Sequence, residues 1–198
     1  MPGFNIAYRT QTGRHPRHES VVDGRLSYHP DALRLMALVR QPENLEQLGI
    51  PLPLPRQPGS IEEQLSAVGF DVTLRVVVDP FRLSLQYTAM PGVLQFFRLA
   101  DGTLIPLPPE HAPARHHLLP ERSESQGEPL QFTAGDAYLA LSPGGGRLAD
   151  SPAVARFLHL RDYFNAEKLV EALLAHLLEL GGAPEAPEDV TALVVEAR

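Results

Sequence analysis

The sequence predicts an α+β domain in which antiparallel strands and helices form separate layers, and two patterns lead to this fold class. Short segments of alternating apolar and polar residues occur near both ends of the chain and in its middle, as strands with one buried face require. Between them lie stretches with apolar residues at helical spacing. The order is strand, helices, several strands, helix and strand, which differs from the regular strand–helix alternation that builds a parallel sheet.

The composition is that of an ordinary globular protein, and it excludes several classes of function. The chain has 198 residues, of which 43% are hydrophobic and 21% are charged, and its net charge is −7. This charge argues against nucleic acid as a partner, because such binding needs clustered Lys and Arg. The absence of cysteine excludes disulfides and thiolate catalysis. No stretch reaches the roughly 20 apolar residues that cross a bilayer, and the amino terminus lacks a signal-peptide pattern, so we expect a cytoplasmic protein without a membrane partner.

In the first third of the chain, residues 4–10 alternate and are expected to form a strand. Residues 21–24 are a short apolar segment, Val-Val, followed by the turn signal Asp-Gly. Residues 30–48 are expected to form a helix, because Pro30 suits its first turn and apolar residues follow at helical spacing. The four prolines of residues 49–59 predict an extended connector, and residues 60–68 begin with a capping-box pattern that predicts a short helix.

The middle of the chain has the clearest strand pattern. Residues 71–79, 83–89 and 92–99 are expected to form an antiparallel meander, with turn signals at Asp79-Pro80 and Asp101-Gly102. Residues 106–128 are polar and rich in proline, which predicts a long exposed loop. Both this loop and the 49–59 connector are expected to lie within a single domain of residues 1–198.

In the last third, three strands are expected at 130–132, 137–141 and 190–196. The run Gly144-Gly145-Gly146 is expected to break the chain. Asn165 is expected to cap a helix with apolar residues on one side, and Gly181-Gly182 to end it.

Four stretches, taken in their order and spacing, resemble the metal-dependent protein phosphatases of the PP2C-like superfamily, and among them the sporulation stage II protein E type. Residues 70–80 and the turn Ala89-Met90-Pro91-Gly92 are similar to the central hairpin of that family. Residues 132–144 resemble its Gly-Asp turn, apolar strand and metal-bearing Ser/Thr-Asp-Gly; residues 163–169 resemble the start of its last helix; residues 187–195 resemble its closing Asp-Asp-x-Thr strand. The resemblance implies a PP2C-like α/β sandwich, with two antiparallel sheets flanked by helices.

The resemblance also implies phosphoester hydrolysis by two Mg²⁺ or Mn²⁺ ions that several aspartates hold. In the amino-terminal part, His18-Glu19-Ser20 stands at the family's Asn-Glu-Asp motif. Asp23 and Gly24 stand at an Asp-Gly motif whose aspartate bridges the metals. Near the carboxyl end, Glu188 stands at the last aspartate of the family, with Asp189 beside it. The candidate metal ligands are therefore Asp23, Gly24, Glu188 and Asp189.

Three positions depart from the family pattern in a way that weakens such a metal site. Pro143 stands where the Ser/Thr-Asp-Gly aspartate belongs, and proline has no side-chain oxygen. Ser20 replaces an acid, and Glu188 is one methylene longer than aspartate. We therefore expect Mn²⁺ or Mg²⁺ to be weakly bound or absent, and we assign no catalytic residue.

Each candidate also has a simpler interpretation. Asp23 before a glycine is a common turn residue, and Glu188-Asp189 suits a polar turn before a strand. His176 lies on the apolar side of the last predicted helix, where a packed histidine is expected. A zinc site at His111, His116 and His117 is disfavoured, because the loop gives no sign of convergent ligands.

Three hypotheses follow. The leading one is a catalytically impaired regulatory domain that binds a partner protein, such as an anti-sigma antagonist, in bacterial Ser/Thr phosphorylation signalling. The first alternative is an active Mn²⁺- or Mg²⁺-dependent protein Ser/Thr phosphatase with a rearranged metal site. The second is a small-molecule binding or scaffold domain that uses the 106–128 loop. The sequence identifies neither the partner nor the oligomeric state.

Overall fold

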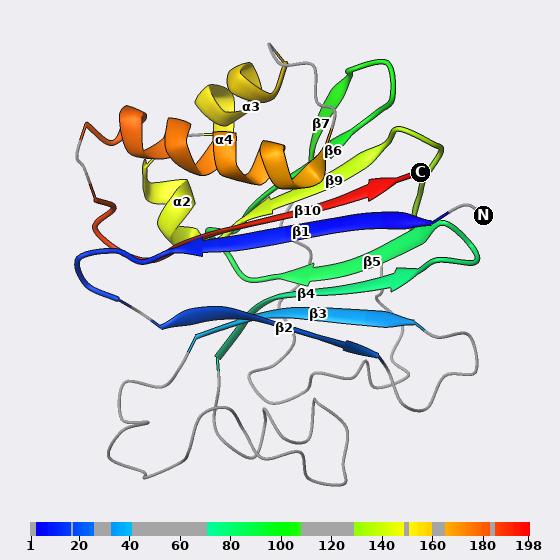
Figure 1. The fold of residues 1–198 in the computed structure, drawn as a ribbon, viewed down its shortest axis with the longest axis horizontal. Helices are drawn as coiled ribbons and strands as arrows, with labels where there is room; N and C mark the ends of the chain where they lie inside the picture. The colour runs from blue at the N-terminus through cyan, green and yellow to red at the C-terminus, as the bar shows by residue number, and fades with distance from the viewer. Residues whose placement is uncertain are drawn as a thin grey trace, which may run out of the picture.

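The computed structural model describes residues 3–16, 18–25, 33–40, 71–107, 129–148, 151–159, 165–182 and 185–198, which form two stacked antiparallel sheets (Figure 1). The first sheet has five strands in the order β1 (Phe4–Gln11), β10 (Val190–Ala197), β9 (Ala137–Leu141), β6 (Leu94–Arg98) and β7 (Leu104–Leu107). The second also has five, in the order β2 (Glu19–Arg25), β3 (Arg34–Arg40), β4 (Asp71–Asp79), β5 (Ser84–Ala89) and β8 (Leu130–Gln131).

Three helices of the described part of the chain cover the outer face of the first sheet (Figure 1). They are α2 (Pro143–Leu148), α3 (Ser151–His159) and α4 (Ala166–Leu180). The buried side of α4, which includes Leu169, Leu173 and Leu177, packs into one core cluster with outward-facing residues of β10 such as Val194. Among the described helices, none combines the length and the apolar character needed to cross a membrane.

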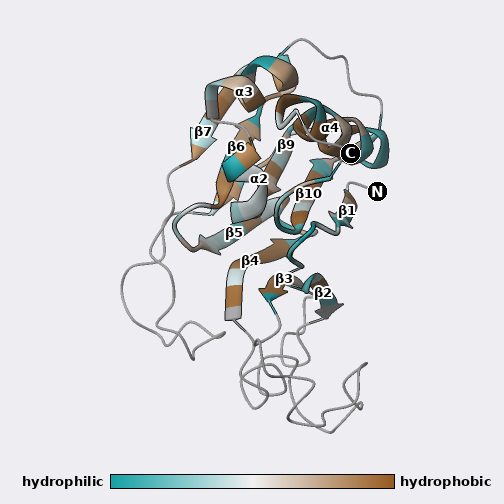
Figure 2. Ribbon diagram, turned by 90° about the vertical axis from the view of Figure 1, so that its left-hand side faces the viewer, coloured by the Kyte–Doolittle hydropathy of each residue, from teal (hydrophilic) through white to brown (hydrophobic). Residues whose placement is uncertain are grey.

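A second core lies between the two sheets. Tyr138 and Leu193 of the first sheet meet Met36, Leu74 and Val76 of the second, and all five side chains are buried. Figure 2 shows the two sheets from the side, with apolar stretches of their strands in brown. Because successive strand residues face opposite sides, β10 contributes to both cores and is apolar along nearly its whole length.

The predicted fold class is confirmed: the molecule is an α+β sandwich of two antiparallel sheets flanked by helices. The first and last strands and the hairpin of β4 and β5 lie where the sequence predicts them. The last predicted helix is α4, and the Asn165 side chain accepts a hydrogen bond of 2.8 Å from the Glu167 amide, as an N-cap should.

The predicted helix at 30–48 is wrong where the structure describes it, because residues 34–40 form the strand β3. Hydrogen-bonded neighbours flank β3 on both sides, β2 and β4. Met36 and Leu38 face the core between the sheets, while Ala37 and Val39 are buried on the other face. A short apolar run buried on both faces has no period that distinguishes strand from helix. Residues 30–32 and 41–48 lie outside the described residues, as do the predicted 49–59 connector, the 60–68 helix and residues 108–128 of the long loop.

The predicted meander is also wrong in one respect. β4 and β5 form a hairpin, but the chain then crosses to the other sheet, where β6 pairs with β7 and β9. β8 and β9 likewise belong to different sheets. Alternation identifies a strand, but it does not identify its neighbours when both faces of the strand meet a core.

Two glycine signals have a different meaning from the expected one. Gly144-Gly145-Gly146 lies inside α2 instead of breaking the chain, and α3 after it was not predicted. Asp23 and Gly24 lie within β2, opposite Met36 and Leu35 of β3, instead of in a turn.

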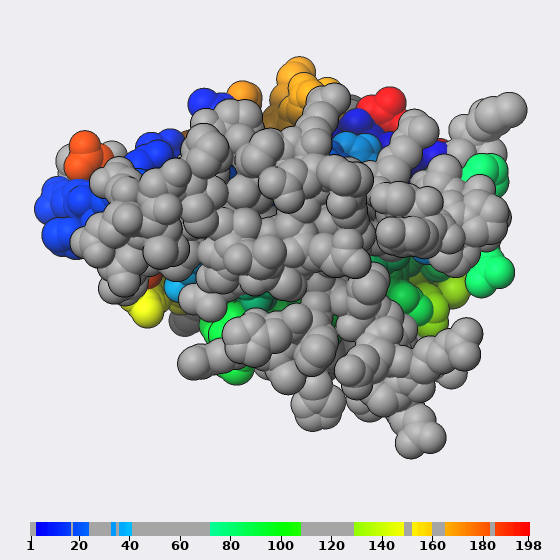
Figure 3. Space-filling view, turned by 90° about the horizontal axis from the view of Figure 1, so that it is seen from below, coloured from blue at the N-terminus to red at the C-terminus, as the bar shows by residue number. Residues whose placement is uncertain are grey.

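Seen from below, the segment that follows β1 is blue at the left, and the turn between β4 and β5 is green at the right, so these segments lie at opposite ends of the sandwich (Figure 3).

The Asn165 cap allows a direct test of the start of α4. Asn165→Ala should lower the free energy of unfolding by about 1 kcal/mol, since it leaves the Glu167 amide without its acceptor. Asn165→Asp retains an acceptor and an N-terminal negative charge, and it should remain close to the original stability. Urea denaturation of the three proteins measures the difference, and equal stability of the Ala and Asp variants would contradict the capping role.

Candidate functional site

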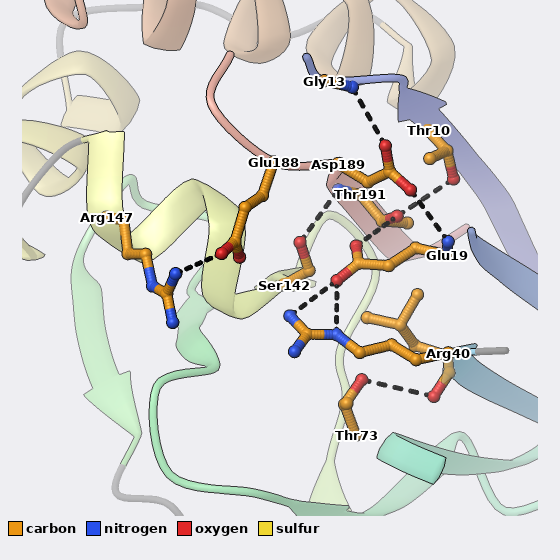
Figure 4. A network of polar contacts seen from close by, with 11 residues as sticks. Thr10, Gly13, Glu19, Arg40, Thr73, Ser142, Arg147, Glu188, Asp189 and Thr191 are labelled. Atoms are coloured by element: carbon orange, nitrogen blue, oxygen red, sulfur yellow. Dashed lines mark hydrogen bonds and ion pairs between the residues drawn. The ribbon is translucent and has the colours of Figure 1, made fainter. Parts of the chain in front are cut away.

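Polar side chains gather at one end of the sandwich, where β1 and β3 end and β2 and β10 begin (Figure 4). Several of them are buried: Glu19, Ser142, Glu188, Asp189 and Thr191 are each at most 9% exposed. Burial of polar groups is unfavourable unless they are hydrogen-bonded or paired. We call Glu19, Glu188 and Asp189 the carboxylate cluster. The hydrogen-bond and ion-pair partners of each carboxylate show whether its oxygens are available to a ligand.

Asp189 connects the segment that follows β1 to the first residue of β2. Its Oδ1 accepts a hydrogen bond of 2.9 Å from the Gly13 amide, just after β1. Its Oδ2 accepts one of 3.0 Å from the Glu19 amide, at the start of β2. β1 belongs to the first sheet and β2 to the second, so one carboxylate holds the chain where it passes between the sheets.

Glu19 has a guanidinium as its main partner. Its Oε1 accepts from Arg40 Nε at 2.9 Å and lies 2.8 Å from Arg40 Nη2. Its Oε2 accepts from the Thr191 hydroxyl at 3.0 Å. The hydroxyls of Thr191 and Thr10 are 2.9 Å apart, and since Thr191 donates its single hydrogen to Glu19, Thr10 is the donor of this second bond.

Glu188 forms an ion pair with Arg147 of α2. The two pairs differ in their exposure to solvent: the Arg147 side chain is 60% exposed, whereas that of Arg40 is 21% exposed and that of Glu19 is 0% exposed. Three carboxylates and two guanidinium groups therefore meet at this end of the sandwich, and the Glu19–Arg40 pair is less exposed to solvent than the Glu188–Arg147 pair.

The backbone around Glu188 and Asp189 is packed closely on both sides. On one side, the Arg14 amide donates to the Ala186 carbonyl at 2.9 Å and the His15 amide to the Pro187 carbonyl at 3.0 Å. A Cβ at Gly13 would come within 2.6 Å of Glu188 Cα, so only glycine fits there. On the other side, a Cβ at Gly144 would overlap the Asp189 carbonyl oxygen. Because neither glycine has a side chain, the segments that contain them pack directly against the backbone of Glu188 and Asp189.

Ser142 fixes the start of α2 against β10. Its amide donates to the Thr191 carbonyl at 2.9 Å, and its Oγ accepts from the Thr191 amide at 3.0 Å. Pro143 follows as the first residue of α2, a position where proline is favoured because its missing N–H has no helical partner. The position that the resemblance assigns to an aspartate thus serves here as a helix start.

The structure brings together only part of the predicted metal site. Glu188 and Asp189 lie in the carboxylate cluster, and Glu19 joins them. Asp23 and Gly24 lie four and five residues further along β2, about 13–17 Å from Glu19 at the rise of a strand. Ser20 is exposed on the face of β2 opposite to Glu19.

Asp23 has a partner of its own at that distance. Arg34 Nε donates to Asp23 Oδ1 at 2.8 Å, and Arg34 Nη2 contacts Oδ2. This hydrogen bond raises the pKa of the Arg34 guanidinium above its ordinary value, against the opposing effect of burial. The Asp23 carboxylate is therefore engaged by a third guanidinium, that of Arg34, away from the cluster.

Sequence reasoning missed the two arginines of the site. Arg40 was expected on a helix, and Arg147 follows a glycine run that was expected to break the chain. Arg40 is the charged residue that ends the apolar run of β3, and such a residue marks the place where a buried strand reaches the end of a sheet. That signal becomes readable only once β3 is known to be a strand.

The ligands that remain do not fit a pair of divalent cations. Mg²⁺ requires about six oxygen ligands in near-ideal octahedral geometry. Here both oxygens of Asp189 accept backbone amides, both of Glu19 accept side chains, and Glu188 pairs with Arg147. Within the described ranges, no group of three or more His, Asp or Glu residues could hold a metal ion.

Comparisons of the sequence find no matching family model and no matching curated protein. Comparisons of the structure find PP2C-type phosphatase domains. The phosphatase domain of SpoIIE from Bacillus subtilis is 11% identical and has a TM-score of 0.61; the match covers 100% of this chain and 92% of that one. PppA of Pseudomonas aeruginosa, a key regulatory component of T6SS, is 19% identical with a TM-score of 0.56, and the match covers 100% of both chains.

A third similar structure is the catalytic domain of the serine/threonine protein phosphatase PstP in complex with two manganese ions. It is 17% identical with a TM-score of 0.56, and the match covers 100% of this chain and 99% of that one. At such identities the similarity establishes the fold and leaves the activity open. The chain has the fold of PP2C-type phosphatase domains, as the resemblance implied.

The close packing at Gly13 gives the next testable prediction. Gly13→Ala should lower the free energy of unfolding by about 1–3 kcal/mol, because its Cβ would overlap the Glu188 backbone. Gly3→Ala is the matched control, since nothing lies within 4 Å of a Cβ there, and it should change stability by less than about 0.5 kcal/mol. Denaturation midpoints of the two variants measure the difference. Equal midpoints would mean that the segment at Gly13 is not packed closely against the Glu188 backbone.

Proposed function

We propose that this chain is a regulatory domain of bacterial Ser/Thr phosphorylation signalling that has the PP2C phosphatase fold, lacks phosphatase activity and acts in the cytoplasm by binding a partner protein. One observation carries the proposal. Each acid of the carboxylate cluster is already engaged, Glu19 and Glu188 by arginines and Asp189 by two backbone amides.

The chemistry that the resemblance implies depends on those acids being available. Two divalent cations activate a water molecule and neutralise charge on the phosphate, and carboxylates must offset the dehydration of these cations. A guanidinium supplies positive charge, but it cannot lower the pKa of a bound water molecule to make it a nucleophile. Because Arg40 is bound to Glu19 and position 143 is proline, the domain has few free carboxylate oxygens for such cations.

The partner class rests on similarity alone. The resemblance to the sporulation stage II protein E type implies signalling through Ser/Thr phosphorylation, in which anti-sigma antagonists are phosphorylated. PppA, which has a similar fold, is itself described as a regulatory component. We therefore propose a protein of the anti-sigma antagonist type as the partner.

An active phosphatase is the second candidate, and the presence of three carboxylates at one end of the sandwich favours it. It would require Arg40 and Arg147 to leave the cluster, and Asp23, Gly24, Glu188 and Asp189 to bind the metals together. Asp23 would also have to part from Arg34. The small-molecule alternative involves the 106–128 loop, most of which lies outside the described residues.

A phosphatase assay separates the two candidates. With a phosphoserine peptide and millimolar Mn²⁺, the purified protein should release phosphate no faster than its Asp189→Asn variant. That variant preserves side-chain size and removes one acid of the cluster, so it controls for contaminating phosphatases. The proposal would be wrong if the protein had a Mn²⁺-dependent rate that fell at least about tenfold in Asp189→Asn or in Asp23→Ala. A tenfold fall corresponds to a loss of ~1.4 kcal/mol in transition-state stabilisation.

The binding role requires its own measurement. We expect an anti-sigma antagonist protein to bind the domain in calorimetry, with the same Kd in Mn²⁺ and in EDTA, because no metal takes part. Phosphorylated and unphosphorylated forms should be compared, to show which state the domain recognises. Absence of binding by both forms would reject this class of partner.

A further inference from the structure

We infer that the Arg40 guanidinium is a built-in cation that takes the place of a divalent metal ion at the carboxylate cluster. The inference deepens the proposed function, since it gives the reason why this site would hold no metal. It concerns binding and stability, however, and can fail while the absence of phosphatase activity still holds.

The geometry at Glu19 is the first argument. The Glu19 side chain is 0% exposed, and a buried carboxylate requires a nearby positive charge or several hydrogen bonds. Arg40 provides the charge: its Nε donates to Glu19 Oε1 at 2.9 Å, and its Nη2 lies 2.8 Å from the same oxygen but makes no hydrogen bond to it. This contact links the last residue of β3 to the first residue of β2, which lie opposite each other in the sheet.

The bonding of the other oxygens is the second argument. Glu19 Oε2 accepts from Thr191, and the two oxygens of Asp189 accept from the amides of Gly13 and Glu19. These bonds hold the acids in place without a metal. A guanidinium is weakly hydrated and enters such a site readily, whereas a small divalent cation gives up its water reluctantly and would have to displace these bonds.

The contrast with Arg147 singles out Arg40. Arg147 also pairs with an acid of the cluster, Glu188, but its side chain is 60% exposed, and a solvent-screened pair contributes little to stability. The Arg40 side chain is only 21% exposed and its partner is fully buried. Removal of Arg40 should therefore leave the buried Glu19 carboxylate without a counter-charge and free its Oε1, the one oxygen of the cluster that a hydrated cation could then reach.

Thermal unfolding with and without metal tests this inference. The original protein should have the same Tm in millimolar Mn²⁺ and in EDTA. Arg40→Ala should lower the Tm in EDTA by about 10 °C, as expected for loss of one partner of a buried pair. Millimolar Mn²⁺ should then raise the Tm of Arg40→Ala, because the ion can bind the Glu19 oxygen that Arg40 leaves and supply the missing positive charge without displacing the other bonds of the cluster.

Arg9→Ala is the matched control. Arg9 pairs with Glu171 at 2.9 Å, nearly the same distance, but both side chains are exposed, by 59% and 62%. Its Tm should change by less than about 2 °C and should not respond to Mn²⁺. If Arg40→Ala does not fold in EDTA, Arg40→Lys replaces it: it should be destabilised, because one ammonium cannot reproduce both contacts, and it should not respond to Mn²⁺, because the positive charge remains.

Three results would overturn the inference. The first is a Tm of the original protein that rises in Mn²⁺, which would mean that a metal binds despite Arg40. The second is a loss of stability in Arg40→Ala no larger than in Arg9→Ala. The third is a response to Mn²⁺ opposite to the expected one in either variant: a destabilised Arg40→Ala protein that is indifferent to Mn²⁺, or an Arg40→Lys protein that Mn²⁺ stabilises. None of these outcomes depends on the phosphatase assay, so the two proposals are judged separately.

Discussion

The Asp189 carboxylate accepts amide hydrogen bonds from Gly13 and from Glu19, and the arrangement of this end of the molecule depends on those two bonds. They hold the chain where it leaves β1 in one sheet and enters β2 in the other. Glu19 is thereby placed with its side chain beside Arg40 and Thr191. A single acid before β10 thus positions a second acid that lies 170 residues earlier in the sequence.

Electrostatics explains why so much charge can lie in a buried place. The carboxylates of the cluster are matched by the guanidinium groups of Arg40 and Arg147 and by the backbone amides of Gly13, just after β1, and Glu19, at the start of β2. Replacing a bound ion by a side chain makes the counter-charge part of the fold. If Arg40 stands in for a metal ion, as we infer, this end of the sandwich needs no metal supply to be ordered, and the domain gives up the reactive water that a metal would hold.

Much of the fold could be predicted from the sequence, because alternation, an N-cap and turn signals are local. Asn165, the β4–β5 hairpin and the closing strand are examples. β3 could not be predicted, since an apolar run buried on both faces carries no period. Of the candidate site, Glu188 and Asp189 were found through resemblance to a closing strand. Arg40 was missed because its role depends on a contact with Glu19 across two strands, and Asp23 was placed in the candidate site although β2 carries it away from the cluster.

The Glu19–Arg40 pair also bears on how such a domain can change over generations. Loss of Arg40 alone leaves a buried acid without its counter-charge. Gain of an acid at position 143 alone leaves Arg40 on Glu19, so the new carboxylate gains no metal partner. The first step lowers stability and the second brings no metal ion, so the two changes favour metal binding only when they occur together. Under the inference drawn for Arg40, a lineage that acquires such an arginine is held away from metal binding by the stability of its own fold.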